Sequence, residues 1–416
     1  MSAPPGPPLR MFSALGVELE FMIVERDTLE PLSIADHVLA TEAGGPASHV
    51  QRGPMGWSNE FVMHVLEVKN TDPTLPAEQL APAFQREVRY LNRLLDHYHA
   101  RLMPTAMHPW MNPAQAQVWR HDNAELYATY ARIFDCSGHG WTNLQSMHLN
   151  LPFADDDEFA RLHAAVRLIL PLLPALCASS PVADGRVAPA LDYRMQVYAH
   201  NADEYPSIAG HIIPEAVCSR REYEQQVLAP MYRDIAPRDP EGRLQHEWLN
   251  SRGAIARFDR NAIELRVIDT QENPKVDLAI AAAVTGMIRR LVQSGPPLDQ
   301  QLAMPTDSLA TIFQSCVQQG EQALVENEEY LALLGYADSS CSAAELLRWL
   351  LEKAIDDERL PGDAARRLHC LAEHGSLSRR ILKALDGDTS RARLARVYRR
   401  LCECLDSGQM FLPSAA

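Results

Sequence analysis

GVELEF, Gly16 to Phe21, is the stretch that decides the fold prediction. Apolar and acidic side chains alternate along it, which predicts a β-strand with its apolar residues on one face. Glu18 and Glu20 then share the opposite face. A strand with one solvated face shows the same alternation. The stretch therefore leaves two interpretations open: a wet strand surface, or a cleft in which two carboxylates hold a cation.

Two other strand-like stretches carry candidate ligands. NEFVMHVLEVKN contains Glu60 and Glu67, which are seven positions apart and would face opposite sides of a continuous strand. A turn or bulge must lie between them if both face one site. NLQSMHLNLPF contains His148, and a single histidine on a strand is more often a satisfied polar residue than a ligand.

The stretch SRGAIARFDRNAIELRVIDTQENP has the richest set of charged residues. Arg252 and Arg257 are five positions apart, while Glu264 and Arg266 are two apart and share a strand face. A carboxylate beside a guanidinium is ordinarily an ion pair. Three arginines near one glutamate also suit a polyphosphate, because the planar guanidinium matches phosphate oxygens.

Together these stretches predict a metal–nucleotide site on the concave face of an antiparallel sheet. Carboxylates gathered in one cleft raise each other's pKa unless a cation offsets their charge. Hard carboxylate oxygens with one imidazole suit Mg²⁺ or Mn²⁺. Arginines beside such a metal suit the phosphates of ATP.

Composition narrows the class of protein. The 416 residues are 46% hydrophobic and 22% charged, as in ordinary globular proteins, and the formal net charge of -15 disfavours nucleic acid or an anionic membrane as partner. The eight cysteines form no paired CxxC pattern. The N-terminus lacks the apolar segment of a secretory signal, and no stretch approaches the roughly 20 apolar residues that span a bilayer. We expect a cytoplasmic protein with small-molecule partners, and leave a homo-oligomer open.

The pattern of predicted elements changes near residue 295. Before it, strands are expected in FMIVER, FVMHVLEVKN, MHLNLPF and AIELRVIDT, and helices over residues 83–102, 158–177 and 276–293. SGPPLDQ, residues 294–300, reads as a linker, and helical patterns dominate after it. We therefore predict a disordered tail over residues 1–10, a catalytic region over 11–295, and a helical extension over 296–416 that packs on it.

The order of these motifs resembles the glutamine synthetase superfamily. SMHLNL is similar to its metal-histidine strand, and SRGAIAR with AIELRVIDTQENP is similar to its arginine-and-glutamate segment. LCASSPVADGRVAPALDYRMQVY resembles a signature of type 2 glutamate–cysteine ligases and bacterial carboxylate–amine ligases. AMHPW resembles their Thr-His-Pro segment but departs from it at Ala106 and Met107. The resemblance covers roughly residues 16–290.

The resemblance implies a fold and a set of site residues. The fold would be α+β, with a glutamine synthetase-like curved antiparallel sheet, helices on its outer face and the helical C-terminal extension. Two divalent metals would be held by two ligand sets, the first Glu20, Glu60 and Glu67, the second Glu18, His148 and Glu264. Phosphate would be bound by Arg252, Arg257 and Arg266, with Arg252, Glu264 and Arg266 in catalytic roles, and substrate by Asn143 and Arg194.

The activity implied by the resemblance is ATP-dependent amide-bond formation. A carboxylate, by default the γ-carboxylate of glutamate, would attack ATP to give an acyl phosphate, which an amine would capture. Cysteine is the default amine, and the sequence leaves other amines open. Two alternatives remain: a phosphagen-type kinase that acts on a guanidino or amine acceptor with the same metal–ATP site, and a non-catalytic binding protein that retains the fold.

Overall fold

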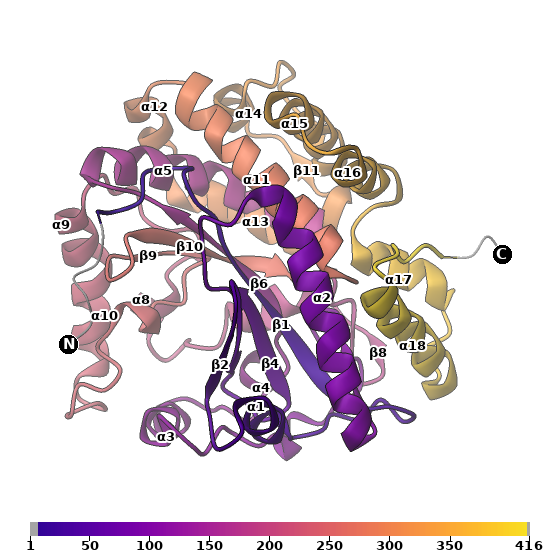
Figure 1. The fold of residues 1–416 in the computed structure, drawn as a ribbon. Coiled ribbons are helices and arrows are strands. Elements are labelled where there is room, and N and C mark those ends of the chain that lie inside the picture. The colour runs from indigo at the N-terminus through magenta and orange to yellow at the C-terminus, as the bar shows by residue number, and fades with distance from the viewer. Residues whose placement is uncertain (1–6, 414–416) are drawn as a thin grey trace.

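A mixed sheet-and-helix fold is seen in the computed structural model, which describes residues 7–413 (Figure 1). Residues 1–6 of the predicted disordered tail lie outside this range. The main sheet has eight strands, in the order β2-β3-β4-β1-β6-β10-β9, with β5 also paired to β1. Their bounds are β1 Gly16–Glu25, β2 His49–Arg52, β3 Met55–Asn59, β4 Val65–Asn70, β5 Ala100–Met103, β6 Ser146–Pro152, β9 Ala254–Arg257 and β10 Ala262–Asp269. All strand pairs in this sheet are antiparallel.

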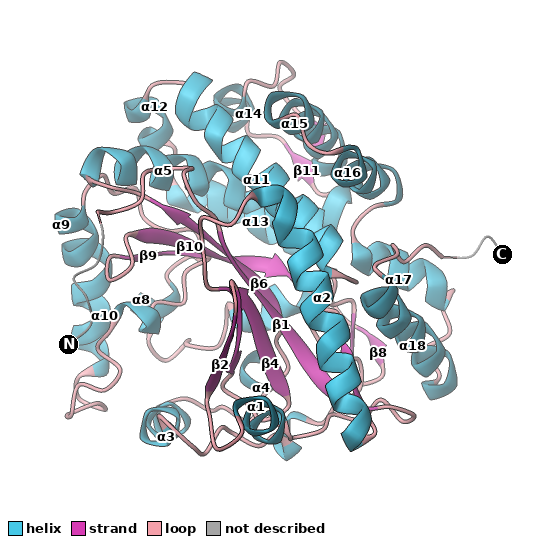
Figure 2. Cartoon of the chain, viewed as in Figure 1, coloured by secondary structure: helices cyan, strands magenta, loops and turns pink. Residues whose placement is uncertain are grey.

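The central strand β1 joins the core to the polar face of the sheet. Val17, Leu19 and Phe21 are fully buried in one hydrophobic cluster. That cluster also contains apolar side chains of three long helices, α2 (Ala77–Leu95), α5 (Asp156–Ile169) and α11 (Pro274–Ser294), which lie over the sheet (Figure 2). Because side chains alternate along a strand, the acidic residues of β1 face away from these helices.

Helix starts follow local signals in the sequence. Asp155 caps α5, its side chain accepting a hydrogen bond from the backbone N–H of Glu158. Asn273 caps α11, with Pro274 at the first helical position. Other helices before residue 295 are α1 (Ala35–Ala43), α3 (Ala124–Ile133), α4 (His139–Thr142), α6 (Leu173–Cys177), α7 (Tyr193–Tyr198), α8 (Pro206–Ala209), α9 (Arg220–Tyr223) and α10 (Ala229–Ile235).

Two predicted elements extend beyond the helix and the strand that the structure shows. The helix predicted over 83–102 ends at Leu95, and residues 100–103 form β5 instead. The helical segment ends at His99, which adopts left-handed backbone angles. Strand β5 follows and pairs with the last residues of β1. The strand predicted from Phe61 begins only at Val65, because the chain turns between β3 and β4.

The chain after residue 295 is mainly helical. It contains α12 (Leu298–Ala303), α13 (Thr306–Gln319), α14 (Glu328–Leu334), α15 (Ala343–Glu358), α16 (Gly362–His374), α17 (Leu377–Leu385) and α18 (Arg391–Ser407). The helices α15 and α16 contact α11, and α18 contacts α2 and β5. Two short strand pairs in the described residues add little to the fold: β7 (Val182–Ala183) with β8 (Arg186–Val187), and β11 (Leu324–Val325) with β12 (Cys341–Ser342).

The last described residues fold back onto the segment after β10. Phe411 is fully buried, and its N–H donates to the Glu272 carboxylate at 3.1 Å. Arg380 pairs with Glu272 and also donates to the Phe411 carbonyl at 2.8 Å. The side-chain amide of Asn273 donates to the Gln409 carbonyl at 2.8 Å. The C-terminal helices are thereby tied to the sheet by buried polar contacts.

One segment bears on the expectation that no stretch could span a membrane. Residues Asp156–Cys177 are long and apolar enough for this by length and composition. In the fold they form α5 and α6, and 94% of the apolar window is buried inside the protein. The segment is accounted for as part of the core.

Candidate active site

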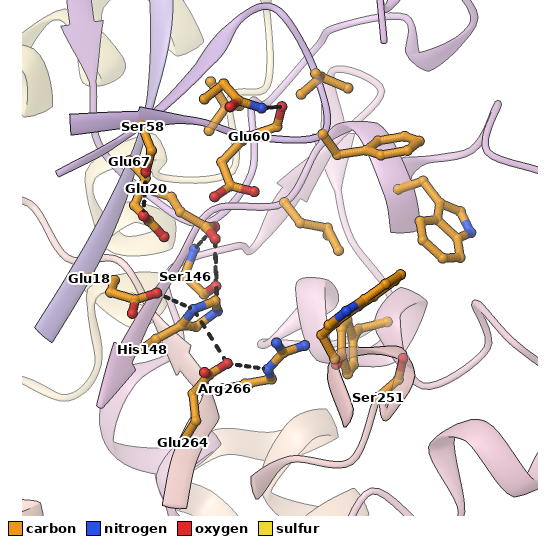
Figure 3. Close-up of a pocket in the computed structure, with 18 of the residues that line it drawn as sticks. Glu18, Glu20, Ser58, Glu60, Glu67, Ser146, His148, Ser251, Glu264 and Arg266 are labelled. Carbon is orange, nitrogen blue, oxygen red and sulfur yellow. Dashed lines mark hydrogen bonds and ion pairs between the residues drawn. The ribbon is translucent and has the colours of Figure 1, made fainter. Parts of the chain in front are cut away.

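A cavity of about 650 Å³ lies against the polar face of the sheet. Neighbouring strands supply its charged lining, as Figure 3 shows for the labelled residues. The strand contributions are Ser58 from β3, Glu67 and Lys69 from β4, Glu18 and Glu20 from β1, Ser146 and His148 from β6, Glu264 and Arg266 from β10, and Arg257 from β9.

Strand register explains why these side chains meet. Glu20 lies opposite Glu67, and Glu18 lies opposite His148. Residues directly opposite each other in an antiparallel pair point to the same face. The wet-surface interpretation of GVELEF is therefore wrong in this fold: Glu18 and Glu20 have side chains only 14% and 10% exposed, and both line the cavity.

The turn between β3 and β4 brings Glu60 to the same cavity. β3 ends at Asn59 and β4 begins at Val65, so Glu60 sits in the turn rather than on a continuous strand. One oxygen each from Glu20, Glu60 and Glu67 lie within 4.8 Å of one another. A second such group combines Glu18, Glu67 and His148. The first group is the predicted first metal set, while the second contains Glu67 where Glu264 was predicted.

Glu264 forms ion pairs with two arginines and lies close to His148. Its Oε1 accepts from Arg266 Nε at 2.6 Å and its Oε2 from Arg257 Nη1 at 3.2 Å. The same Oε1 lies 4.0 Å from His148 Nδ1. The ion-pair interpretation thus describes the observed contacts, and metal ligation by Glu264 remains a prediction.

The electrostatics of the cluster depend on burial and on close carboxylates. Burial, followed by the charges of Glu20 and Glu67, raises the pKa of Glu60 well above its usual value. Burial and the charge of Glu18 raise the pKa of Glu67 to about 7. Burial acts to raise the pKa of Glu18, but its hydrogen bond to His148 and the charges of His148 and Lys69 together outweigh burial and hold the pKa well below its usual range. The protein alone therefore leaves part of the acidic cluster without a compensating cation.

His148 is the basic centre of this cluster. Its Nδ1 lies 3.3 Å from Glu18 Oε2, and its Nε2 lies 3.0 Å from Ser146 Oγ. Burial lowers the pKa of the imidazole, but the hydrogen bond with Glu18 and the surrounding carboxylates raise it to about 9. Such a histidine must release a proton before a metal can bind it.

Two predicted residues do not line the cavity. Arg252 is 3% exposed, and its guanidinium donates to both carboxylate oxygens of Glu215 at 2.6 Å. It lies in the bend before β9 begins at Ala254, so strand alternation does not set its direction. Asn143 is fully buried and bonds to the backbone N–H and carbonyl of His108 at 2.6 and 3.0 Å. Both side chains bind protein groups beside the cavity, and their predicted contacts with phosphate and substrate stay predictions.

Arg194 reaches the cavity from a buried position. It lies on α7, is 2% exposed, and lines the cavity. Its Nε donates to Asp269, and its other guanidinium nitrogens lie 3.3 Å from the Arg266 carbonyl. Asp269 also accepts from Ser179 N at 2.7 Å and Ser180 Oγ at 3.0 Å. The ASSP stretch therefore supports the acid that orients Arg194.

Several lining residues were not predicted. Lys69 donates from Nζ to Glu67 Oε1 at 2.5 Å and follows it by two positions, so the alternation that placed Glu67 could also have identified Lys69. Arg260 Nη1 lies 3.9 Å from Glu18 Oε1, in the turn between β9 and β10. An aromatic group without a recognisable sequence signal completes the lining: Phe61, Tyr127, Tyr130, Trp141 and Trp248.

Comparison with known proteins places this cavity in a family context. The family model described as "Glutamate-cysteine ligase family 2" matches residues 14–399. An uncharacterized protein of Archaeoglobus fulgidus is 29% identical over 398 residues, which cover 96% of this chain and all of that protein.

Two solved structures share the fold. A glutamate–cysteine ligase of Francisella tularensis, solved with AMP, has a TM-score of 0.56 and 11% identity, covering 96% of this chain and 90% of that chain. A bifunctional glutathione synthetase of Pasteurella multocida has a TM-score of 0.54 and 16% identity, covering 94% of this chain. This chain spans about half of the Pasteurella protein, 52% of its length.

Proposed function

Because this chain belongs to glutamate-cysteine ligase family 2, we propose that its cavity joins the γ-carboxylate of glutamate to an amine. Membership makes the chain an ATP-dependent ligase of the carboxylate–amine class. The two substrates are our proposal. Cysteine is the first amine to test, because LCASSPVADGRVAPALDYRMQVY resembles the glutamate–cysteine ligase signature.

The observation that carries this proposal is the acidic cluster on one face of four neighbouring strands. Its oxygen donors and single imidazole fit Mg²⁺ or Mn²⁺ by chemistry, and the raised pKa values of Glu60 and Glu67 show that a cation would relieve their repulsion. Bound there, a divalent metal would neutralise phosphate charge during transfer. The proposed ligands are Glu18, Glu20, Glu60, Glu67, His148 and Glu264.

The protein's own residues would bind and orient the reactants. Arg257, Arg260 and Arg266 line the cavity on the β9–β10 side and offer donors to phosphate oxygens. Glu264 holds Arg257 and Arg266 in place. In the proposed reaction a carboxylate oxygen attacks the γ-phosphorus of ATP and ADP leaves. The amine nitrogen then attacks the acyl carbon and phosphate leaves, so that no covalent bond to the protein is needed.

Arg194 would bind the α-carboxylate of the glutamate substrate. Its guanidinium reaches the cavity, and Asp269 fixes its orientation from behind. Because Asp269 already partners one edge of the guanidinium, the substrate would receive a planar donor set with little further loss of side-chain freedom.

The test is ADP release across a panel of carboxylates and amines, with and without Mg²⁺. The ligase proposal expects ADP only when a carboxylate and an amine are both present, and none in chelator. ADP formed with a guanidino acceptor alone would indicate the phosphagen-type kinase instead. ATP binding without turnover for every pair would indicate a binding protein. Calorimetric titration of ATP in chelator supplies a separate readout, in which unchanged affinity would contradict the metal site.

We also propose the finer architecture and location expected from the sequence. The sheet would be the curved sheet of the glutamine synthetase type, and residues 296–416 an extension packed on the catalytic region. Contacts of α15 and α16 with α11 support this packing. A cytoplasmic location is supported by all eight cysteines being free in the described chain.

A further inference from the structure

The cavity has a second end, made of aromatic rings. We call Phe61, Tyr127, Tyr130, Trp141 and Trp248 the aromatic end. Their rings contact one another at centroid distances of 5.5 to 5.8 Å for the pairs Phe61–Tyr127, Phe61–Trp141, Tyr130–Trp141 and Tyr130–Trp248. All five line the cavity and all are partly exposed rather than buried.

Strand register separates Phe61, in the aromatic end, from two of the basic residues. Along β1, the Gly16 end pairs with Asn150, and the next strand across brings Ala262 opposite Arg257 at the same end. The Met22 end pairs with Val65, where β4 begins after the turn that carries Phe61. Arg257 and Arg260 therefore lie past one end of the acidic cluster and Phe61 lies past the other, while Trp248 belongs to a short helical turn, Glu247–Leu249, that packs against β9.

The aromatic end directly adjoins an acid. The side-chain amide of Asn59 donates both to the Tyr127 hydroxyl and to the Glu60 carbonyl, each at 3.1 Å. Phe61 follows Glu60 in the chain. In Figure 3 the Glu60 carboxylate points into the cavity, toward the space between the strands and the rings. A group bound against the rings would therefore lie beside a carboxylate.

This arrangement favours one reactant over the others. Partly exposed rings around a cavity are a binding surface for an apolar or flat group, because covering them removes apolar area from water. An ammonium is attracted both to a carboxylate and to aromatic faces. Arg257 and Arg260, two of the arginines proposed for the triphosphate of ATP, lie at the opposite end of the acidic cluster from Phe61. The amine substrate therefore fits the aromatic end better than adenine does.

We propose that the amine substrate of this protein carries an aromatic or bulky apolar side group, which binds against the aromatic end. This inference rests on the proposed ligase function and narrows its amine to a class larger and more apolar than cysteine. The amino group would lie toward Glu60 and the acyl phosphate, and the side group would pack against the rings of Phe61, Tyr127 and Trp141.

The kinetic test compares 2-phenylethylamine and L-phenylalanine with L-cysteine and methylamine as acceptors, with glutamate and MgATP held constant. We expect a KM for at least one aromatic amine at least tenfold below those for cysteine and methylamine. Phe61→Leu should raise the KM for that amine about fivefold and leave the KM for ATP within twofold. Trp248→Leu provides a second variant if the first does not fold. Trp349→Leu, whose ring packs on Tyr336 away from the cavity, is the matched control and should change neither value.

A binding measurement separates this inference from the proposed function. The protein is titrated calorimetrically with 2-phenylethylamine, alone and with glutamate plus a non-hydrolysable ATP analogue. Saturable binding that Phe61→Leu weakens, without ADP release from any substrate pair, would support the aromatic site and overturn the ligase proposal. Turnover with cysteine but no binding of aromatic amines would overturn the inference and leave the ligase standing. A KM increase for ATP alone would assign the aromatic end to adenine and would also overturn the inference.

Discussion

Glu67 belongs to both candidate metal-ligand sets of the cavity, the one with Glu20 and Glu60 and the one with Glu18 and His148. Its substitution therefore tests the metal site most directly. Its pKa in the folded protein, about 7, lies above the ordinary value of 4.5. Such a carboxyl binds its proton more tightly in the folded state, and it weakens folding as pH rises from 4.5 through 7. We expect Glu67→Gln at pH 8, in chelator, to be as stable as the wild type or more stable, by up to roughly 3 kcal/mol. Urea unfolding measures this, and the variant should lose its stabilisation by Mg²⁺.

Glu87→Gln is the matched control for that variant. Glu87 is a buried acid outside the cavity lining that accepts from Arg52 Nε at 2.7 Å and Trp57 Nε1 at 2.9 Å. Its loss should cost about 1–3 kcal/mol, because two donors lose a charged acceptor, and Mg²⁺ stabilisation should be retained. Equal destabilisation in both variants would make Glu67 a structural partner of Lys69 and would contradict the metal role.

The protons on His148 and Glu67 predict how metal binding depends on pH. With pKa values of about 9 and about 7, both groups hold protons below neutrality when no metal is present. Metal binding must displace these protons, so the apparent affinity should rise with pH. We expect the increase in Tm caused by Mg²⁺ to be larger at pH 8 than at pH 6, as measured by thermal unfolding. The same increase at both pH values would show that these groups do not bind the metal.

The site could be predicted only where spacing along one strand determines direction. Alternation places Glu18 and Glu20 together, and the same reasoning would have found Lys69. It gives no direction for Arg252, which lies in the bend before β9 and binds Glu215. Arg260 and Trp248 reach the cavity from turns and loops. Tertiary packing alone determines their position, and no periodicity records it.

His163 is the feature of α5 that predicts acid sensitivity. It is 1% exposed, and neither ring nitrogen has a hydrogen-bond partner among the described residues. Burial, with the charges of Arg167 and Arg252, lowers its pKa to about 3. A histidine with a depressed folded pKa contributes its full stability above 6.5 and loses it as pH falls toward 3.

Replacing this imidazole by a ring that cannot titrate should reduce the acid sensitivity. The site is aromatic, with Phe159 and Tyr223 rings at centroid distances of 5.2 and 6.0 Å. We expect His163→Phe to stabilise the protein by roughly 2 kcal/mol more at pH 5 than at pH 8. Urea unfolding at the two pH values checks this. A gain that does not depend on pH would mean that His163 is not the titrating group.

At the scale of elements, hydrophobic periodicity predicted which helices and strands exist better than it predicted where they begin and end. The strands at 16–25 and 262–269 and the long helix α11 follow clear patterns and cap signals. The helix predicted over 83–102 wrongly included part of β5. The sequence of β5, ARLM at residues 100–103, is too short to show a strand period, and only pairing with β1 makes it a strand. The short helices between Tyr193 and Ile235 have too few residues for a helical period to be recognised.

At the scale of the whole molecule, Phe411 packs the C-terminal end of the described chain into the core. Its ring is fully buried, with the Arg400 guanidinium 5.1 Å from the ring centroid. We expect Phe411→Ala to lower the free energy of unfolding by about 3–5 kcal/mol, the usual cost of removing a buried ring. Leu412→Ala removes a neighbouring side chain that is 41% exposed and should change stability by less than about 0.5 kcal/mol. Similar effects of the two variants in urea unfolding would show that the ring is not part of the core.

The contacts of α11 predict that the two predicted regions fold together. Its buried face includes Val284 and Ile288, and α15 and α16 pack against the helix. A fragment ending at Ser294 would expose this surface to water. We expect it to be unstable and inactive, and we expect limited proteolysis near Ser294 to release no folded core. A stably folded, active fragment with this end would contradict the prediction that residues 296–416 pack on the catalytic region.

One face of β1 packs in the core and the other lines the cavity, and this limits the mutations that its coding sequence can accept. Because the strand period is two, loss of one codon within Gly16–Glu25 would exchange its two faces beyond that point. Acidic side chains would then enter the layer beneath α2, while apolar ones would replace them in the cavity. Such a deletion removes folding and chemistry in one event, whereas a substitution of Glu18 leaves the apolar face intact. Insertions and deletions in this strand should therefore be absent from functional descendants even where substitutions are accepted.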